Sequence, residues 1–276
     1  LQARKGGVEV VIVPNDDSGT IDLGLLETEL AKPSTRLMCL THISMANGGI
    51  QPAEAVGSFT HAAGVPYLLD AAQSLGQGEL DVDELQCAFL VATGRKFLRA
   101  PRGTGLLYVR SSALDSLSDP VFVDVRSAAW TGKWSYSPRP GSRRFELGEH
   151  SYAARAGLGA ALGYANDLDL QQVEACIASL ATKLRDGLTS TEGVSVWDRG
   201  ERLSGIVTFT VAGLDPSTVA RRLEERDIYL NAPAAHNAQF DFQDRGVDHV
   251  VRAGVHYFNT ESELDRLLEA VSAMAS

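Results

Sequence analysis

The chain has 276 residues, 44% of them hydrophobic, and a formal net charge of -10 at pH 7. This length suits one large or two modest domains, and the acidic balance argues against a general nucleic-acid binder. The three cysteines, Cys39, Cys87 and Cys176, are unclustered and indicate neither a disulfide framework nor a zinc site or other metal centre. No apolar run approaches the ~20 residues that span a bilayer. We therefore expect a cytoplasmic protein with neither a membrane nor a nucleic-acid partner.

The first half of the chain alternates short apolar runs with helical patterns. The expected order is a strand at 8–13, a helix at 22–32, a strand at 36–42, a helix at 52–63 and strands at 65–70, 87–92 and 106–109. An irregular stretch follows at 111–143. Strands that alternate with helices predict an α/β fold with a mainly parallel sheet, whose ligands bind at the carboxyl ends of the strands.

The second half of the chain has a different pattern. Small residues at helical spacing predict a tightly packed helix at 153–168. Beyond it we expect a helix at 171–188, a strand at 205–211, a helix at 216–226, a strand at 228–230 and a last helix at 261–274. This pattern predicts a second, smaller α/β domain. We place the boundary near residue 160, which gives a large domain at 1–160 and a small C-terminal domain at 161–276.

Two apolar runs of the first half each end in a charged residue. Asp70 closes the run that begins at Val65, and Lys96 lies in Thr93-Gly94-Arg95-Lys96, just after the run Cys87–Ala92. Such a pair suits a cofactor that needs a Schiff base at one end and an anion at the other, and pyridoxal 5'-phosphate (PLP) is that cofactor. Two plainer interpretations remain: Lys96 as a surface lysine opening a loop, and Asp70 as a helix N-cap.

Several blocks of the sequence resemble the class V aminotransferase group of PLP enzymes. They lie in the family's order at 41–44, 67–73, 92–109, 144–151 and 251–260. The resemblance implies the fold type I architecture, with a large PLP-binding domain, a smaller C-terminal α/β domain and a homodimer. Relatives carry a substantial segment before Leu1, with a phosphate-binding loop and the residue that stacks on the ring. We therefore expect the N-terminal part of the family fold to lie outside this sequence.

The resemblance gives Lys96 and its neighbours specific roles. Lys96 matches the lysine that holds the cofactor and then serves as general base and acid at the substrate Cα. Asp70 matches the carboxylate that keeps a proton on the pyridine nitrogen, and Gln73 the residue that contacts the ring oxygen. Thr93 and Arg95 flank the lysine where the family contacts the phosphate. Arg95 replaces a histidine there, and its forked donors suit a phosphate equally well.

Arg252 matches the arginine with which the family binds the substrate α-carboxylate. Plainer interpretations again stand beside the functional ones. Arg252 could form a strand-end salt bridge, Gln73 could be a polar residue in a first helical turn, and the arginines around Lys96 could be a solvated basic face. His42 lies near the cofactor face in the family's pattern, but a lone histidine is often structural.

Cysteine desulfurases of this family need a nucleophilic cysteine on a loop that corresponds to 231–245, and that stretch contains none. The blocks Gly94–Arg99 and Phe145–Ser151 instead resemble most the PLP-dependent C–S lyases of bacterial ergothioneine biosynthesis, which cleave hercynylcysteine S-oxide. That resemblance implies loss of the sulfur group and release of pyruvate and ammonia. An aminotransferase, an amino-acid epimerase or a PLP-fold protein without catalysis are the alternatives.

The substrate of those lyases carries a trimethylammonium group. Quaternary cations are commonly held by aromatic faces. Trp130 and Trp134 lie in the irregular stretch after the lysine block, and we hypothesise that they line the substrate pocket. The alternative is a packing or interface loop.

Overall fold

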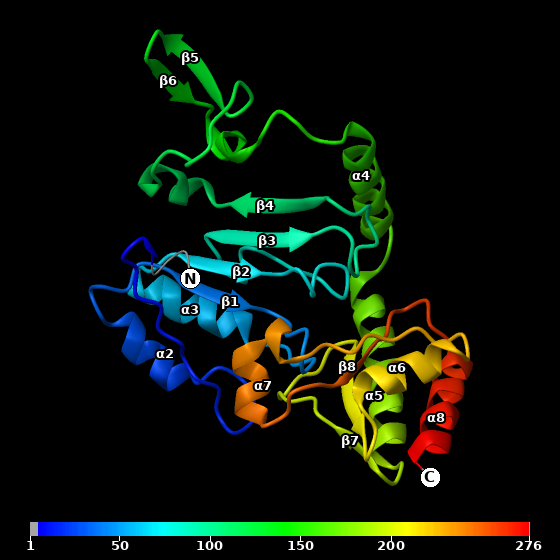
Figure 1. Cartoon of the computed structure of the whole chain (residues 1–276). Helices are drawn as coiled ribbons and strands as arrows, with labels where there is room; N and C mark the ends of the chain where they lie inside the picture. The colour runs from blue at the N-terminus through cyan, green and yellow to red at the C-terminus, as the bar shows by residue number, and fades with distance from the viewer. Residues whose placement is uncertain (1–4, 276) are drawn as a thin grey trace.

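The computed structural model describes residues 5–275 and contains a four-stranded sheet in the first half of the chain (Figure 1). Its strands run in the order β1 (Met38–Thr41), β2 (Tyr67–Asp70), β3 (Phe89–Thr93) and β4 (Gly105–Val109). β1, β2 and β3 are parallel, and β4 is antiparallel to β3. The expected α/β fold with a mainly parallel sheet is therefore confirmed, with an antiparallel strand after Lys96.

Helices α2 (Leu23–Leu30) and α3 (Ala53–Ala63) cover one face of this sheet. Side chains alternate along a strand, so Tyr67 and Leu69 of β2 are buried against these helices, and Leu68 and Asp70 face the other side. Gly64 ends α3 in the left-handed conformation, with φ of 66°, which suits glycine because it has no Cβ. This turn feeds the chain into β2, which carries Asp70 to the sheet edge.

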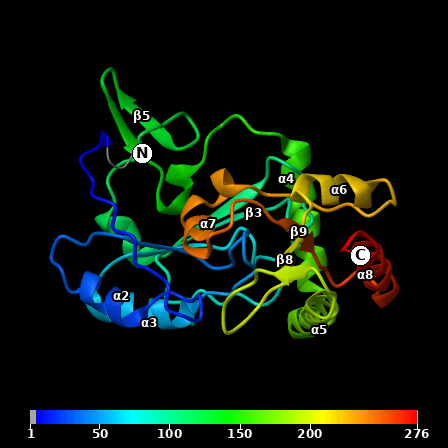
Figure 2. The ribbon, with the colours of Figure 1, turned by 60° about the horizontal axis from the view of Figure 1, so that its bottom comes forward.

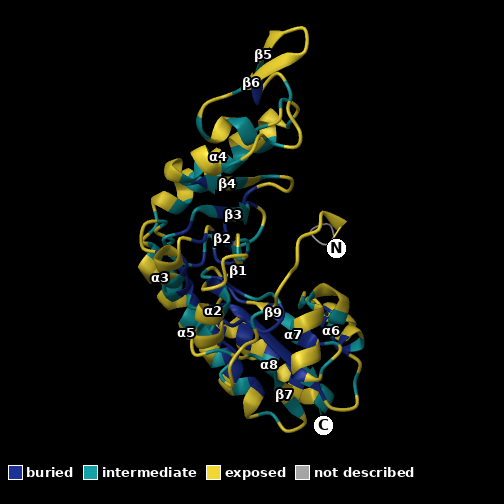
Figure 3. Cartoon of the chain, turned by 90° about the vertical axis from the view of Figure 1, so that its left-hand side faces the viewer, coloured by how far each residue is buried: buried dark blue, intermediate teal, exposed yellow. Residues whose placement is uncertain are grey.

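A second sheet belongs to the C-terminal half and has a separate core. It consists of β7 (Val194–Val196), β8 (Ile206–Val211) and β9 (Val251–Gly254), all antiparallel. The core of this half is built from these strands and from α5 (Leu170–Thr189), α6 (Pro216–Glu224) and α8 (Glu261–Ala275). Figure 3 shows buried residues gathered in this half and around β1–β3, while the segments beyond β4 are mostly exposed.

The short helix α7 (Gln239–Arg245) links the two halves. Its Arg245 donates a hydrogen bond to the carbonyl oxygen of Ala46 at 3.0 Å, and its Asp241 accepts one from the Asn47 side chain. Phe242 packs with Ala46 and Val250 in a small buried cluster. Figure 2 shows α7 beside the first sheet. The sequence does not predict this helix, because seven residues between loops give little periodicity.

Four expectations about single elements are wrong. Residues 8–13 form no ladder with any described strand, and their valines and isoleucine are mostly exposed. Residues 228–230 are irregular, and only Asn231 next to them bridges Arg252. The helix α4 (Tyr152–Asn166) has no buried residue, although a tightly packed helix was expected. The stretch 111–143, expected to be irregular, contains a hairpin of β5 (Ala128–Gly132) and β6 (Ser135–Pro138). The 3-10 helix η1 (Ser111–Ser116) precedes the hairpin, and η2 (Gly141–Phe145) follows it.

The domain boundary near residue 160 stays a prediction. Residue 160 lies inside α4. In the sequence, the first sheet and its core precede this helix, and the second sheet and its core follow it. Between residues 5 and 275, no helix is long and apolar enough to cross a membrane.

His42, directly after β1, should make the stability of the fold sensitive to acid. Burial lowers the pKa of this imidazole from an ordinary 6.5 to about 4, with Arg202 adding to the effect and Glu54 opposing it. The neutral form therefore stabilises the fold fully above about pH 6.5, and this contribution is lost as the pH falls toward 4. Between pH 7 and pH 5 we expect the free energy of unfolding to drop by roughly 2 kcal/mol more in the native chain than in a His42→Asn variant. Urea unfolding of both proteins at the two pH values checks this, and equal drops would contradict it.

Candidate active site

Lys96 lies in a tight turn at the end of β3, at the carboxyl edge of the parallel strands. The turn is held by the backbone: Gly94 N–H donates to Thr104 O at 2.9 Å, and Arg99 N–H donates to Lys96 O at 2.8 Å. A side chain at Gly94 would collide with Thr104 and Ala100, so this position requires glycine. The turn therefore presents Lys96 in a fixed place relative to β2.

Strand register places Asp70 at the sheet edge where β3 ends, on the same face as Val91 of β3. Asp70 pairs with Thr41 of β1 and with Val91 of β3, and Thr93 lies on the same face as Val91. The Asp70 carboxylate accepts a hydrogen bond from Ala72 N–H at 2.9 Å. The alternative N-cap role is not formed, because turns and not a helix follow Asp70.

The half-buried amine of Lys96 is surrounded by charges that change its protonation. Burial lowers the pKa of Lys96. The positive charges of Arg95 and Arg252 lower this pKa further, and the negative charge of Asp70 opposes the change. Asp70 and Arg252 thus lie near enough to act on this amine electrostatically. A lowered pKa leaves more of the amine neutral, which is the form that can attack a carbonyl or accept a proton.

Arg252 of the second sheet carries a positive charge that has no counterion in the described part of the chain. Its backbone is fixed in β9, pairing with Thr208 of β8, and its N–H donates to Asn231 O at 2.7 Å. Among the described residues the guanidinium has no ion pair and no hydrogen-bond partner, so the alternative of a strand-end salt bridge is not formed. Burial lowers the pKa of Arg252. A partly buried guanidinium without a counterion is suited to bind the carboxylate of a ligand.

The other predicted cofactor contacts lie close by in sequence, and their roles stay predictions. The Thr93 hydroxyl donates only a long hydrogen bond, 3.4 Å, to Thr104 O. Gln73 is buried, and its carbonyl oxygen accepts from the Gln77 side chain at 2.8 Å. Arg95 is exposed, and no ion pair to it forms within the described part of the chain.

His256 joins the Lys96 turn to the strand of Arg252, a role that the sequence does not indicate. Its Nδ1 accepts from Tyr257 N–H at 2.9 Å, so Nε2 carries the proton and donates to Phe97 O at 2.9 Å. The ring also stacks on Phe97 with centroids 5.3 Å apart. Arg99 adds a hydrogen bond to the Tyr257 hydroxyl. This role depends on the contact with Phe97, which is distant in sequence, so no local pattern could have indicated it.

Trp130 and Trp134 are not brought to this site within one chain. They lie on the β5–β6 hairpin and are 81% and 90% exposed. Figure 1 shows this hairpin projecting beyond β4, away from the second sheet that carries Arg252. Their predicted role in substrate binding is left to experiment.

The residues at this edge fit PLP. The cofactor needs an amine for its aldehyde carbon and a carboxylate for its ring nitrogen, and this edge carries the amine of Lys96 and the carboxylate of Asp70. Arg252 remains available for the carboxylate of an amino-acid substrate. The fold and the site together define a PLP-dependent enzyme of fold type I.

The chain belongs to the class V aminotransferase family, since the family profile described as aminotransferase class-V matches residues 1–267. A probable cysteine desulfurase from Methanothermobacter thermautotrophicus is 29% identical over 279 residues, which cover 100% of this chain and 69% of the relative. The probable cysteine desulfurases of Halalkalibacterium halodurans and Synechocystis are covered to 65%. The chain thus spans about two thirds of the length of these relatives.

Solved structures give the same family. The apo cysteine desulfurase from Thermococcus onnurineus superposes with a TM-score of 0.91 at 28% identity, over 99% of this chain and 68% of that one. A cystine C–S lyase in complex with cysteine persulfide has a TM-score of 0.82 at 26% identity, over 98% and 70% of the two chains. A variant of that lyase contains glycine covalently linked to its PLP cofactor. The class V resemblance is confirmed, whereas the narrower one to ergothioneine lyases is absent from these names.

Proposed function

We propose that this chain forms most of a PLP-dependent C–S lyase that removes the sulfur group from the Cβ of a cysteine S-conjugate. The observation that carries this proposal is that Lys96, a half-buried amine whose pKa is lowered, follows β3 at the sheet edge where Asp70 ends β2, while the Arg252 guanidinium has no partner among the described residues. Family membership supports the cofactor, and the relatives are named for enzymes of sulfur amino acids.

When bound, PLP supplies an electron sink for charge that develops at the substrate Cα. Asp70 holds a positive charge at the far end of that sink. Arg252 orients the substrate through its α-carboxylate. Lys96 removes the Cα proton, and the electron pair of that C–H bond forms the Cα–Cβ double bond as the Cβ–S bond breaks. The sulfur leaves with its electron pair, and the three-carbon remainder takes up water to give pyruvate and ammonia.

The cysteine content of the chain favours elimination over transfer of sulfur to the enzyme. The segment 231–245, where desulfurases of the family carry their nucleophile, forms η3 (Ala235–Asn237) and α7 and contains no cysteine. Cys87 is buried, and burial raises the pKa of the Cys39 and Cys87 thiols, which disfavours the reactive thiolate. A leaving group that departs intact needs no such thiolate.

As the finer proposal, the substrate is a cysteine S-conjugate sulfoxide, with hercynylcysteine S-oxide the first to test. The purified enzyme should release pyruvate and ammonia from it without any keto acid. Formation of alanine from free cysteine, with its sulfur passed to an added thiol as a persulfide, would instead indicate desulfuration. A strict need for a keto acid would indicate an aminotransferase, and racemisation without pyruvate an epimerase. Cofactor binding without any product would leave the non-catalytic alternative.

Removal of the Arg252 guanidinium should weaken substrate binding. A charged hydrogen bond typically contributes about 1.5–3 kcal/mol, so Arg252→Gln should raise KM about 10–160-fold, with a smaller effect on kcat. Arg252→Lys keeps the charge but loses the forked donors of the guanidinium, so its KM should lie between those of the native chain and Arg252→Gln. Steady-state kinetics gives both constants. An unchanged KM in both variants would show that the substrate carboxylate binds elsewhere.

If the tryptophans of the hairpin contact a trimethylammonium group, they do so from another copy of the chain, because they project away from their own Lys96. We propose such a homodimer. Replacing Trp130 and Trp134 by leucine should then raise KM about 2–30-fold for the betaine, and less for its des-methyl analogue. Equal effects on the two substrates would end this hypothesis.

A further inference from the structure

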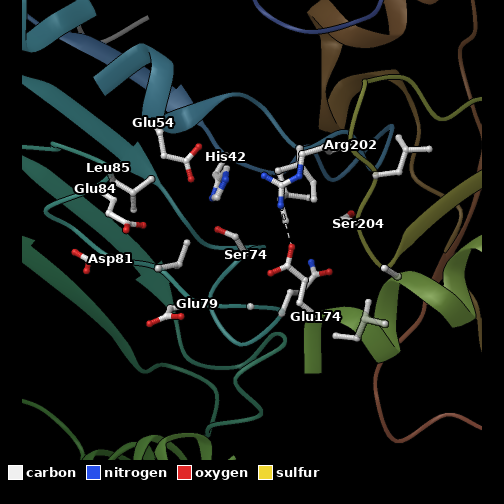
Figure 4. A pocket seen from close by; sticks show the side chains of 18 residues that line it. His42, Glu54, Ser74, Glu79, Asp81, Glu84, Leu85, Glu174, Arg202 and Ser204 are labelled. Atoms are coloured by element: carbon white, nitrogen blue, oxygen red, sulfur yellow. Dashed lines mark hydrogen bonds and ion pairs between the residues drawn. The ribbon is translucent and has the colours of Figure 1, made fainter. Parts of the chain in front are cut away.

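A separate cavity of about 340 Å³ lies between the two halves of the chain (Figure 4). One side is formed by the end of β1, α3 and the loop 74–85, and the other by α5 and residues 202–204. Lys96, Asp70, Arg95 and Arg252 are not among its lining residues. The cavity lies on the side of the first sheet that α3 covers, whereas Asp70 faces the other side.

The rim of this cavity is strongly acidic. It carries the carboxylates of Glu54, Glu79, Asp81, Glu84 and Glu174. Its single lining arginine, Arg202, is already paired with Glu174 at 2.9 Å. Figure 4 shows this pair on one side of the cavity and the other acidic side chains on the opposite side. The rim attracts cations and repels anions.

Two buried polar side chains of the cavity lack partners. The Nδ1 atom of His42 and the hydroxyl of Ser74 accept and donate no hydrogen bond within the described part of the chain, although the residues are only 9% and 3% exposed. Figure 4 places both side chains between the two acidic sides. Burial lowers the pKa of His42 to about 4, so near neutral pH the ring carries no charge and can accept a hydrogen bond. Such unpaired groups are costly to bury, and a rotation of either side chain toward the cavity would let a ligand with N–H donors satisfy them.

Apolar side chains line a further part of the cavity. They come from both halves of the chain: Ile43, Ile50, Leu80, Leu85, Ile177 and Leu203. Among residues 5–275, no group of three or more histidine, cysteine, aspartate or glutamate side chains is arranged to hold a metal ion. The cavity therefore suits a molecule with a short apolar body and a charged head that donates several hydrogen bonds.

We propose that this cavity is a binding site for a small organic cation, with a guanidinium or ammonium head near His42 and Ser74 and an aliphatic body against the isoleucines and leucines. The site is distinct from the proposed lyase centre and does not depend on that activity. Because both halves of the chain line it, a bound cation would hold them together and stabilise the fold.

The proposal is tested by calorimetry on the cofactor-loaded protein with pentylguanidinium and, as a neutral probe with the same body, 1-pentanol. We expect the cation to bind measurably and 1-pentanol to bind at least about tenfold more weakly. The double variant Glu79→Gln, Glu84→Gln should weaken cation binding about tenfold, and Ser74→Ala should weaken it further. Glu192→Gln, an exposed carboxylate outside the cavity, is the matched control and should bind like the native chain.

A Lys96→Arg variant should bind the cation with unchanged affinity, which separates this site from the lyase centre. Equal affinity for the two probes would overturn the proposal, as would full binding in both the double variant and Ser74→Ala. Loss of binding in Lys96→Arg alone would place the probe in the lyase centre and also overturn it.

Discussion

Replacement of Lys96 by alanine is expected to lower kcat by about 10³-fold or more, because the variant loses both the covalent attachment of the cofactor and the proton carrier at Cα. The turn around Lys96 is held by backbone hydrogen bonds, so the fold should survive the change. Pyruvate formation from a cysteine S-conjugate measures the loss. The absorbance that a lysine-linked cofactor gives should disappear as well.

Two further variants separate the amine from its charge. Lys96→Arg retains the positive charge, but a guanidinium stays protonated and cannot attack the aldehyde, so this variant should be as inactive as Lys96→Ala. Lys32→Ala removes an exposed lysine that pairs only with Glu29 and should keep native activity. Activity above a few per cent of native in Lys96→Arg would remove Lys96 from the centre of the reaction.

Substitution of Asp70 by asparagine should be the next most damaging change. The amide keeps the shape and can still accept from Ala72 N–H, but it cannot balance a proton on the ring nitrogen. Removing one preorganised electrostatic partner of this kind commonly costs about 10²–10³-fold in kcat. We expect a loss of that size with a small change in KM, measured by the same pyruvate assay.

The environment of Lys96 gives a second readout for Asp70. The carboxylate opposes the lowering of the lysine pKa, so its neutralisation should lower that pKa further. The acidic limb of the pH–rate profile should therefore move to lower pH in Asp70→Asn. Native kcat with an unmoved profile would show that Asp70 faces away from the reacting groups, in the role of a turn residue.

The regular elements of the fold were predictable where periodicity was strong. Asp70 and Lys96 were found because each follows a buried run, and parallel pairing of β2 and β3 then placed both at one edge. The run 8–13 misled because β-branched residues favour a strand wherever a partner exists, and no described strand pairs with it. In α4 the small residues suggested close packing, and a side chain at Gly157 would collide with Pro101, yet no residue of the helix is buried.

Features that depend on contacts between distant residues could not be predicted from the sequence. His256 gained a role only when its ring met Phe97, 159 residues away in the chain. His42 was expected near the cofactor face, but it lines the acidic cavity with Glu54. Burial there lowers the pKa of its imidazole. That Arg252 has no partner among residues 5–275 likewise depends on which acidic residues the fold leaves distant from it.

The central claim is that the amine of Lys96 holds PLP. Reduction of the cofactor-loaded protein with borohydride converts a lysine Schiff base into a stable amine, and mass spectrometry of the peptides then locates it. We expect a phosphopyridoxyl group on the peptide that contains Lys96 and no such group in the Lys96→Arg variant. A label on another lysine, or no label on a protein that binds PLP, would contradict it.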